Sequence, residues 1–335
     1  MEKKWLAEIE KSAKRIEFST FLIGVVLSSD MDEKLDEAGR LAAKAKIKRE
    51  LGMALERKWK KLGRTVDFKN PEAVFTVNLH SKRLQTSILP LFIYGRYLKP
   101  SRKIPQSRWP CGRCNGRGCA HCDGKGVMYE ESVESLVGAP LLRETGATAT
   151  KMHAAGREDI DARMLGTGRP FVLELENPQK RNPNLKRIEK EINEKCKGKA
   201  EAHGLRLVGK DSVLKIKSAS PPKTYSLLVA CGRRIAPADI AKIRKLAGKS
   251  LAQRTPERVL HRRADLERKR KILALDVEQI DKKTFRLTIS AEAGMYIKEF
   301  VTGDKGRTRP SISQLLCRRC VPSELDVTSV DFRLK

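Results

Sequence analysis

Four cysteines near the middle of the chain have the spacing of a metal site. They form two Cys-x-x-Cys pairs, and each pair is followed by x-Gly-x-Gly. Glycine lets the backbone turn tightly enough for main-chain amides to point at sulfur. Four thiolates make a closed tetrahedral set for zinc, which then has a structural role rather than a catalytic one. The pattern therefore predicts a structural zinc module held by Cys111, Cys114, Cys119 and Cys122.

Two other interpretations of these cysteines are less favourable. A pair of disulfides would suit a secreted chain and is disfavoured inside cells. A zinc deaminase would need His-x-Glu upstream, and His80, His121 and His153 are followed by Ser-Lys, Cys-Asp and Ala-Ala. Deaminase chemistry is therefore excluded. A further pair, Cys317 and Cys320, has no second pair nearby and is expected to be two half-buried thiols on a helix.

Residues 153–171 form the segment best suited to catalysis. Within nineteen residues they include three glycines, three arginines and three acids, with no helical or strand period before the last residue. A loop so rich in opposite charges is either a salt-bridged surface turn or an active site, and composition leaves both open. In a Gly-Arg-x-Asp turn such as 156–159, neighbouring cations can hold the aspartate ionised, as a nucleophile or base requires.

The elements that must position these residues predict an α+β protein. Residues 36–61 carry apolar side chains at four-residue spacing and predict one amphipathic helix. Two more helices are expected at 184–197 and 237–247, the second with Pro at its start and Gly after its end. Residues 18–27 are expected to be a buried strand or helix. Strands are predicted at 75–79, 89–94, 171–175, 205–208, 213–217, 225–231, 272–278 and 285–291.

The charge balance points to a polyanionic partner. The 335 residues include 70 Lys plus Arg against 41 Asp plus Glu, a formal net charge of +29. A body that is basic throughout repels itself unless a polyanion screens it, so nucleic acid is the leading candidate. A surface of solvated lysines is the alternative. Residues 95–103 interleave aromatic and basic side chains, as RNA-binding segments do, and residues 261–271 are either a phosphate clamp or an exposed face.

Length and hydropathy limit the class of protein further. The length suits two or three domains. The longest apolar stretch, residues 18–27, covers about half of the roughly twenty residues that a membrane span needs. Acidic residues precede it, and no signal-peptide cleavage pattern follows. We therefore expect a soluble, cytoplasmic protein without a membrane partner.

Several motifs together resemble one family. They are Trp109-Pro110-Cys111, Gly-Arg-Glu-Asp at 156–159, Gly-Arg-Pro-Phe at 168–171 and Tyr-Ile-Lys-Glu-Phe at 296–300. They resemble the archaeal and eukaryotic tRNA pseudouridine synthases of the Pus-ten family, and the likeness runs from about residue 18 to 332. It implies a THUMP-like RNA-binding domain at 1–105, a zinc module at 106–128, and a pseudouridine synthase domain with a mixed, mostly antiparallel sheet at 129–335.

The resemblance also implies the catalytic residues. Asp159 matches the aspartate that attacks ribose C1′ or assists loss of a C2′ proton. Tyr225 resembles the tyrosine that stacks on the target base, and Lys298 resembles the basic partner of the aspartate. Leu315 or Leu316, with Leu315 favoured, resembles the apolar residue beneath the uracil.

The substrate implied by the resemblance is tRNA, modified at uridine 54, uridine 55 or both in the T-arm. Arg157 and Arg169 are expected to line the pocket, and Arg262 and Arg263 to contact the RNA backbone. Apart from structural zinc, no cofactor and no protein partner is implied. The competing hypothesis is a non-catalytic zinc-containing RNA-binding protein or chaperone, and ribosomal RNA is an alternative substrate.

Overall fold

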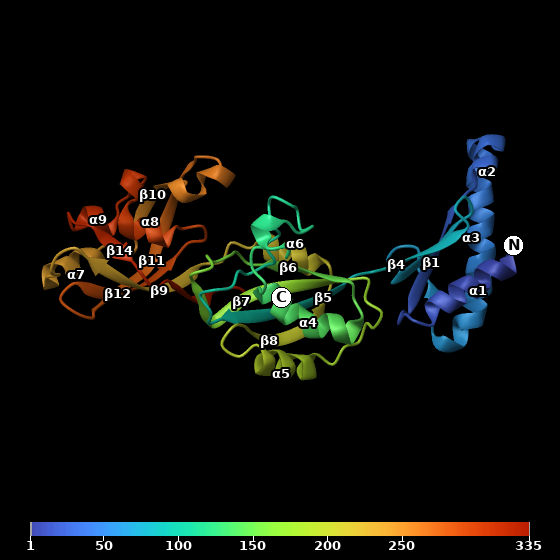
Figure 1. The fold of residues 1–335 in the computed structure, drawn as a ribbon, viewed down its shortest axis with the longest axis horizontal. Helices are drawn as coiled ribbons and strands as arrows, with labels where there is room; N and C mark the ends of the chain where they lie inside the picture. The colour runs from blue at the N-terminus through green and yellow to red at the C-terminus, as the bar shows by residue number, and fades with distance from the viewer. Residues whose placement is uncertain (1, 335) are drawn as a thin grey trace. The chain divides into compact units, whose positions relative to one another are not determined.

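The computed structural model describes residues 2–334, apart from the side chain of Arg262. The chain divides into two compact units, each with its own hydrophobic core. The first unit comprises the chain up to Phe92 together with Gly138–Lys151 and Glu174–Ile188. The second comprises Ile93–Val137, Met152–Leu173 and the chain from Glu189 onward. Figure 1 shows the elements of each unit along the chain.

A four-stranded sheet forms the centre of the first unit. Its order is β2 (Thr65–Val66), β1 (Thr20–Val26), β3 (Ala73–Asn78) and β4 (Arg83–Ile88). Strand β1 is parallel to β2 and β3, whereas β3 and β4 are antiparallel. The helical elements of the chain before Phe92 are α1 (Glu2–Ala13), α2 (Ser29–Lys34), α3 (Glu37–Trp59) and the 3-10 turn η1 (Lys60–Leu62).

The core of the first unit lies between helices α1 and α3 and one face of this sheet. Alternate residues of β1 and β3 are buried, as expected for strands with one covered face. Trp59 of α3 packs edge-on against Phe21, with ring centroids 4.9 Å apart. The Asp36 side chain caps α3 by accepting a 2.8 Å hydrogen bond from the Gly39 amide. The predicted helix at 36–61 is confirmed, and residues 18–27 contain a strand.

The second unit is built on the larger sheet, which has eleven strands within residues 2–334. Strand β15 is parallel to β7, whereas β9 to β14 pair antiparallel, so the predicted mixed, mostly antiparallel sheet is confirmed. The main path runs β13 (Thr308–Arg309), β10 (Ser250–Arg254), β11 (Glu267–Gln279), β12 (Thr284–Ala291), β9 (Lys223–Cys231), β15 (Asp326–Val330), β7 (Arg163–Glu176), β5 (Leu91–Lys99), β8 (Glu201–Val208). Beside this path, β14 (Cys320–Pro322) pairs with β9 and β6 (Ala149–Ala154) pairs with β7.

Short helices pack against the strands β9, β11 and β12. Ile243, Phe300 and Ile312, from three different helices, are fully buried in one core with the inward residues of these strands. This core fixes the position of α8, whose first turn carries Lys298. The helical elements between residues 120 and 315 are η2 (Ala120–Cys122), α4 (Val133–Thr145), α5 (Leu185–Lys195), α6 (Asp211–Ser218), α7 (Pro237–Arg244), η3 (Glu257–Arg262), α8 (Ile297–Thr302), η4 (Asp304–Gly306) and α9 (Ile312–Leu315).

The strand predicted at residues 213–217 is wrong, because this segment lies in helix α6. Asp211 and Lys215 form an ion pair of 2.7 Å one helical turn apart, and Ile216 is buried. In so short a segment, the spacing of the few apolar residues fits a helix as well as a strand, so the sequence alone does not distinguish the two.

Two further predictions need correction. Residues 153–171 are irregular only in part, since β6 ends at Ala154 and β7 begins at Arg163. Cys317 and Cys320 do not share a helix: Cys317 is exposed after the end of α9, and Cys320 is buried in β14. The Cys320 Sγ lies 2.9 Å from the Sγ of Cys231 on the paired strand β9.

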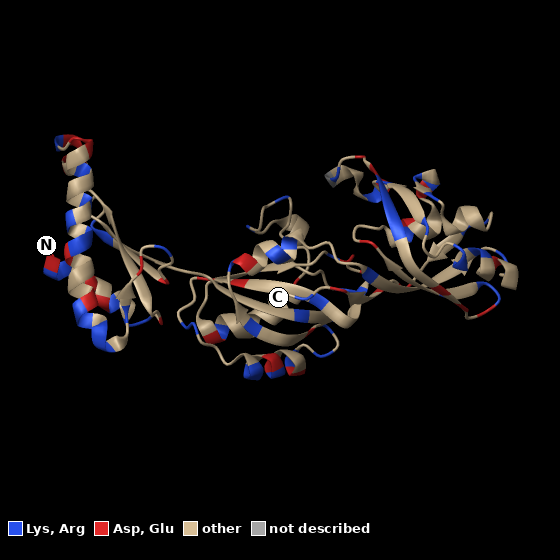
Figure 2. Ribbon diagram, turned by 180° about the vertical axis from the view of Figure 1, so that it is seen from behind, with Lys and Arg blue, Asp and Glu red and all other residues tan. Residues whose placement is uncertain are grey.

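Basic side chains follow several elements of both units. Figure 2 shows Lys and Arg along α3 and at the start of β11, where residues 268–271 are all basic. Among residues 2–334, no helix combines the length and the apolar character needed to cross a membrane.

Candidate active site and four-cysteine module

A cavity of about 570 Å³ lies within the second unit. Its lining comes from the loop after β6, from β9, from η3, from the start of α8 and from the segment entering β15. Six of the residues predicted from the sequence line it, namely Arg157, Asp159, Arg169, Tyr225, Arg263 and Lys298. Residues that are up to 141 positions apart in the sequence, Arg157 and Lys298, therefore meet at one cavity.

Asp159 lies between two cations in this cavity. Its carboxylate oxygen Oδ2 is 3.2 Å from Nη1 of Arg258 and 3.4 Å from Nζ of Lys298. Lys298 also pairs with Asp161 at 2.9 Å, so one ammonium bridges two carboxylates. Burial acts against ionisation of Asp161, but the hydrogen bond and the charge of Lys298 lower its pKa. The carboxylate of Asp159 is thus oriented by side chains from η3 and α8.

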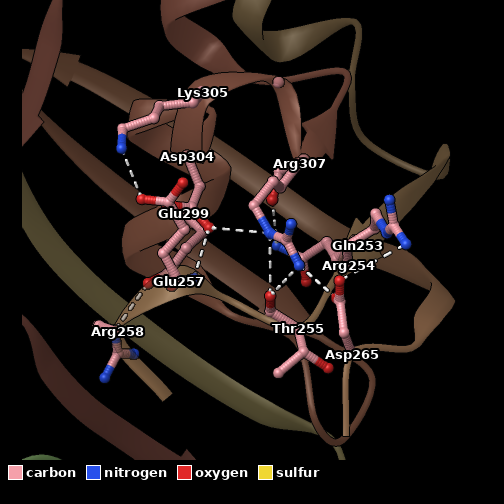
Figure 3. Close-up of polar contacts among 12 residues, drawn as sticks. Gln253, Arg254, Thr255, Glu257, Arg258, Asp265, Glu299, Asp304, Lys305 and Arg307 are labelled. Atoms are coloured by element: carbon pink, nitrogen blue, oxygen red, sulfur yellow. Dashed lines mark hydrogen bonds and ion pairs between the residues drawn. The ribbon is translucent and has the colours of Figure 1, made fainter. Parts of the chain in front are cut away.

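Arg258 is itself held in place by a second acid. Its Nε donates to Oε1 of Glu299 at 2.7 Å (Figure 3). Glu299 directly follows Lys298 on α8. Figure 3 also shows that the loop around η3 is tied to the segment at η4 by further polar contacts. These contacts are Glu257 with Lys305 at 2.7 Å, Arg307 with the Thr255 carbonyl at 2.8 Å, and Arg307 with Asp265. Both cations around Asp159 are therefore held by α8, since Lys298 belongs to this helix and Arg258 binds its Glu299.

The residue before Asp159 belongs to a buried ion pair. The side chains of Glu158 and Arg169 are each 1% exposed, and Arg169 Nε donates to Glu158 at 2.8 Å. The Tyr97 hydroxyl donates to the same carboxylate at 2.9 Å, and Arg169 also donates to the Ala155 carbonyl at 2.8 Å. Burial and the Glu158 charge raise the pKa of Tyr97 well above its usual range, so this hydroxyl stays a donor.

Lys99 anchors the loop on the other side of Asp159. It is fully buried at the end of β5, and its Nζ donates to the carbonyls of Ser101, Ile104 and Ile160 at 3.1, 3.2 and 2.8 Å. Burial lowers its pKa. Since Ile160 follows Asp159 and Glu158 precedes it, the catalytic candidate is fixed from both neighbours.

Two side chains of β9 complete the floor of the cavity. Burial raises the pKa of Tyr225 to about 12, so its phenol is neutral at physiological pH. Lys223 lines the cavity two residues before it. Burial, helped by the charge of Arg169, lowers the pKa of Lys223 to about 8. Alternate residues of a strand share a face, which explains why both reach the cavity.

The predicted arginines occupy different depths. Arg157 is exposed and lies over the ring of Trp109, with the guanidinium carbon 5.3 Å from the ring centroid. Arg169 is buried, as described above. Arg263 donates to the Tyr296 hydroxyl at 2.9 Å. The predicted contact of Arg262 with the RNA backbone involves a side chain that lies outside the described part of the structure.

The predicted leucine lies elsewhere. Leu315 is half-buried and packs against the core of the second unit, and neither it nor Leu316 is among the residues lining the cavity. Leu325 and Val327 supply apolar lining instead. Val327 belongs to β15, which lies between β7 and β9.

Sequence reasoning missed Arg258, Trp109, Lys223 and Leu325 as lining residues. Trp109 begins the Trp-Pro-Cys motif, Arg258 lies in Gln-Arg-Thr-Pro-Glu-Arg-Val at 253–259, and Lys223 is two positions before Tyr225. The alternation of a strand would have identified Lys223 once Tyr225 was placed in the site.

The four cysteines form a cluster whose size fits zinc. Their sulfur atoms all lie within 4.8 Å of one another, and three of the pairs are 3.8 to 3.9 Å apart. A tetrahedron with Zn–S bonds of about 2.3 Å has sulfur–sulfur edges of about 3.8 Å. The donor set and its dimensions are therefore compatible with one structural zinc ion held by Cys111, Cys114, Cys119 and Cys122.

Main-chain amides support these thiols, as the glycine spacing predicted. The amides of Gly118 and Gly126 donate to the sulfur atoms of Cys114 and Cys122 at 3.2 Å each. Gly118 has φ +90° and Gly126 has φ +70°, a region that favours glycine. A Cβ at these positions would lie 2.5 and 2.3 Å from a main-chain oxygen, so only glycine fits.

Comparison with known proteins gives the class to which this fold and site belong. The family model for the archaeal Pus10 THUMP domain matches residues 5–78, and the model for the Pus10 C-terminal domain matches residues 92–331. The four-stranded unit is thus a THUMP domain, and the sheet around the cavity belongs to a Pus10 C-terminal domain. The chain belongs to the Pus10 family, which confirms the resemblance seen in the motifs.

Curated relatives agree over nearly the whole chain. A protein of Methanothrix thermoacetophila is 41% identical over 327 residues, which are 95% of this chain and 71% of the relative. A protein of Methanocaldococcus jannaschii is 40% identical, covering 95% of this chain and 70% of its own. A protein of Methanothermobacter marburgensis is 42% identical, with 94% and 79% covered. All three are named tRNA pseudouridine synthase Pus10.

Proposed function

We propose that this chain is a tRNA pseudouridine synthase that isomerises uridine 54, uridine 55 or both in the T-arm of tRNA. The observation that carries the proposal is the position of Asp159 between Arg258 and Lys298, in a cavity that Tyr225 also lines. Membership of the Pus10 family supports the reaction and the class of RNA. The proposed location is the cytoplasm.

The cavity suits one nucleotide that has left its helix or loop. Its volume of about 570 Å³ lies within the ~300–1,000 Å³ of typical small-molecule sites. Turning a base out of its stack costs a few kcal/mol, and contacts of phosphates with the surrounding cations offset part of this cost. Arg263, at the cavity, and Arg262 are the proposed phosphate contacts, while Arg157 and Arg169 line the pocket.

In the proposed reaction, the Asp159 carboxylate either attacks ribose C1′ or removes the C2′ proton, and the C1′–N1 bond breaks. The uracil then turns within the cavity, and C5 forms the new bond to C1′ as the Asp159–C1′ ester bond breaks or, on the second route, as Asp159 returns the proton to C2′. The C5 proton is lost and N1 gains a proton, so substrate and product have the same composition. No oxidant, reductant or organic cofactor takes part in this balance.

The other residues orient the base in this scheme. The Tyr225 ring stacks on the uracil, and its neutral phenol can donate a hydrogen bond. Lys298 keeps the carboxylate of Asp159 directed at the sugar. For the apolar contact beneath the uracil, the cavity lining favours Leu325 and the sequence resemblance favours Leu315. The variants Leu325→Ala and Leu315→Ala distinguish the two.

Zinc is proposed as a structural ion of the four-cysteine module. Four thiolates leave no open coordination position, so the metal would stabilise the fold of a segment with few apolar residues. The domain boundaries proposed from the sequence are 1–105 for the THUMP-like region, 106–128 for the zinc module and 129–335 for the catalytic domain.

The test is formation of pseudouridine in an unmodified tRNA transcript, located by carbodiimide adducts and primer extension. Wild-type protein should modify position 54, 55 or both, and Asp159→Asn should modify neither. Asp161→Asn is the matched control: it also removes a carboxylate that lines the cavity and pairs with Lys298, but not the carboxylate proposed to react. Product from Asp159→Asn, or no product from wild type with tRNA, would reject the proposal; binding without product would favour a non-catalytic RNA-binding protein.

A further inference from the structure

Trp109 is an exposed indole at the cavity. The three tryptophans of the chain differ sharply: Trp5 and Trp59 are each 4% exposed within the core of the first unit, whereas Trp109 is 38% exposed and lines the cavity of the second. A large aromatic side chain left half in water beside a basic cavity is typical of a binding surface.

The backbone around Trp109 is fixed by the base of the four-cysteine module. Its carbonyl accepts a 2.9 Å hydrogen bond from the Met128 amide. Pro110 forms a β-bridge with Val127, and the Cys111 amide donates to the Gly126 carbonyl at 2.9 Å. The indole is therefore presented by two segments joined through a β-bridge and two main-chain hydrogen bonds, rather than by a free loop.

Two side chains contact the indole. The Tyr129 ring is tilted by 36° with its centroid 5.7 Å away. The Arg157 guanidinium carbon lies 5.3 Å from the Trp109 centroid. Arg157 precedes Asp159 by two residues, so the stacked pair lies close in sequence to the catalytic candidate. Indole rings and guanidinium planes are the groups on which proteins stack unpaired RNA bases.

We propose that Trp109 and Arg157 form a second base-binding subsite, which stacks a nucleobase adjacent to the reacting uridine in a single-stranded stretch of RNA. This inference rests on the proposed function. When one uridine is turned into the cavity, its neighbours lose a stacking partner. An aromatic ring at the cavity replaces that partner and lowers the cost of turning the base out. Tyr225 contacts the reacting uracil, and Trp109 contacts its neighbour.

The subsite also assigns a purpose to the four-cysteine module. The first cysteine of the module lies two residues after Trp109, and the last lies six residues before Met128, whose amide binds the Trp109 carbonyl. Ordering of this segment thus sets the position of the indole relative to Arg157. The module acts on RNA binding through this positioning, without contacting the reacting atoms.

The test is a binding cycle between protein variants and abasic RNA. Unmodified tRNA transcripts are prepared with one base removed at each of the two positions on either side of the modified uridine. Stacking on an aromatic side chain contributes about 5- to 140-fold in affinity by alanine substitution. Trp109→Ala should weaken tRNA binding by a factor in this range, and Trp109→Phe should restore most of it. Leu214→Ala, which truncates an exposed side chain of α6 away from the cavity lining, is the control expected to match wild type.

The cycle identifies the stacked base by non-additivity. At one position, removal of the base should weaken binding to wild type by a similar factor and leave binding to Trp109→Ala unchanged. Equal abasic penalties in wild type and Trp109→Ala at all four positions would overturn the subsite. Pseudouridine formation by wild type is measured in parallel. If wild type makes the product and the penalties are equal, the subsite alone fails; if wild type makes none, the proposed function fails.

A fluorescence measurement decides the case in which Trp109→Ala does not fold. Because Trp5 and Trp59 are buried, Trp109 is the tryptophan that acrylamide can reach. Stacking of a base on Trp109 should quench the fluorescence of this accessible tryptophan. Binding of tRNA should therefore quench wild type, and this part of the quenching should be absent in Trp109→Phe. Identical quenching of the two proteins at saturating tRNA would also overturn the proposal.

Discussion

Replacing Glu158 with glutamine removes the charge of a buried carboxylate and keeps its shape. Glu158 accepts hydrogen bonds from Arg169 at 2.8 Å and from Tyr97 at 2.9 Å, and both members of the ion pair are 1% exposed. Glutamine can still accept from Tyr97 and leaves the guanidinium of Arg169 buried without an opposite charge. Loss of one member of a buried ion pair costs about 3–5 kcal/mol.

This cost translates into a large fall in Tm. At about 2–4 °C per kcal/mol for a domain of 150–250 residues, Glu158→Gln should lower Tm by roughly 6–20 °C. Arg169→Met should be destabilised similarly, because it leaves the carboxylate unpaired. The double variant should lose clearly less than the sum of the two single losses, since it no longer buries an unpaired charge.

Differential scanning calorimetry of the four proteins measures these values. Glu158 directly precedes Asp159, so product formation at a temperature where all four remain folded shows in addition whether the pair positions the loop. A Glu158→Gln protein with the Tm of wild type, or strictly additive losses in the double variant, would show that the pair is not the buried support described here.

Three further predictions concern the rest of the site. Between a pH of about 8 and the usual pKa of 10.5, Lys223 is neutral in the folded protein and protonated in the unfolded one, so the unfolded chain binds more protons and the contribution of this group to stability rises with pH. The unfolding free energy of wild type minus that of Lys223→Met should therefore increase across this pH window. A difference that stays flat or falls would contradict the lowered pKa. Cys114→Ser should lose most of the zinc that the wild-type protein retains after dialysis, whereas Cys317→Ser, which alters an exposed thiol, should keep it. Zinc is measured by inductively coupled plasma mass spectrometry, and equal zinc content in the two variants would contradict a metal site at the four cysteines. Leu325→Ala should lower kcat/KM for tRNA about tenfold or more, because the variant loses an apolar contact with the uracil. Leu315→Ala should have this effect only if the residue beneath the uracil is the one assigned from the sequence. Single-turnover rates at a temperature where both variants are folded distinguish the two assignments.

The features that could be predicted from the sequence are those encoded locally. The cysteine spacing gave the four-cysteine cluster because all its ligands lie within twelve residues. The Gly-Arg-Glu-Asp turn identified Asp159 as a candidate, because a short segment carries the glycine and the charges together. The long helix α3 was predicted correctly because Ile47, Leu51, Leu55 and Trp59 repeat at four-residue spacing, a pattern that a strand does not produce.

The features that were missed depend on contacts between distant segments. Arg258 reaches Asp159 across 99 residues, and its position depends on Glu299 and the η4 segment. Leu325 enters the cavity because β15 pairs with both β7 and β9, a pairing that no local pattern specifies. Short elements such as α6 have too few residues for their period to be decided without the tertiary structure.

The most direct test of the central claim is a crystal structure of the Asp159→Asn variant bound to an unmodified tRNA transcript. The variant should hold the substrate without converting it. We predict that one T-arm uridine is turned into the cavity, with its ribose C1′ or C2′ within about 3–3.5 Å of the side chain at position 159, the separation required for reaction. A uridine bound at another site, or a cavity that remains closed to the RNA, would contradict the account.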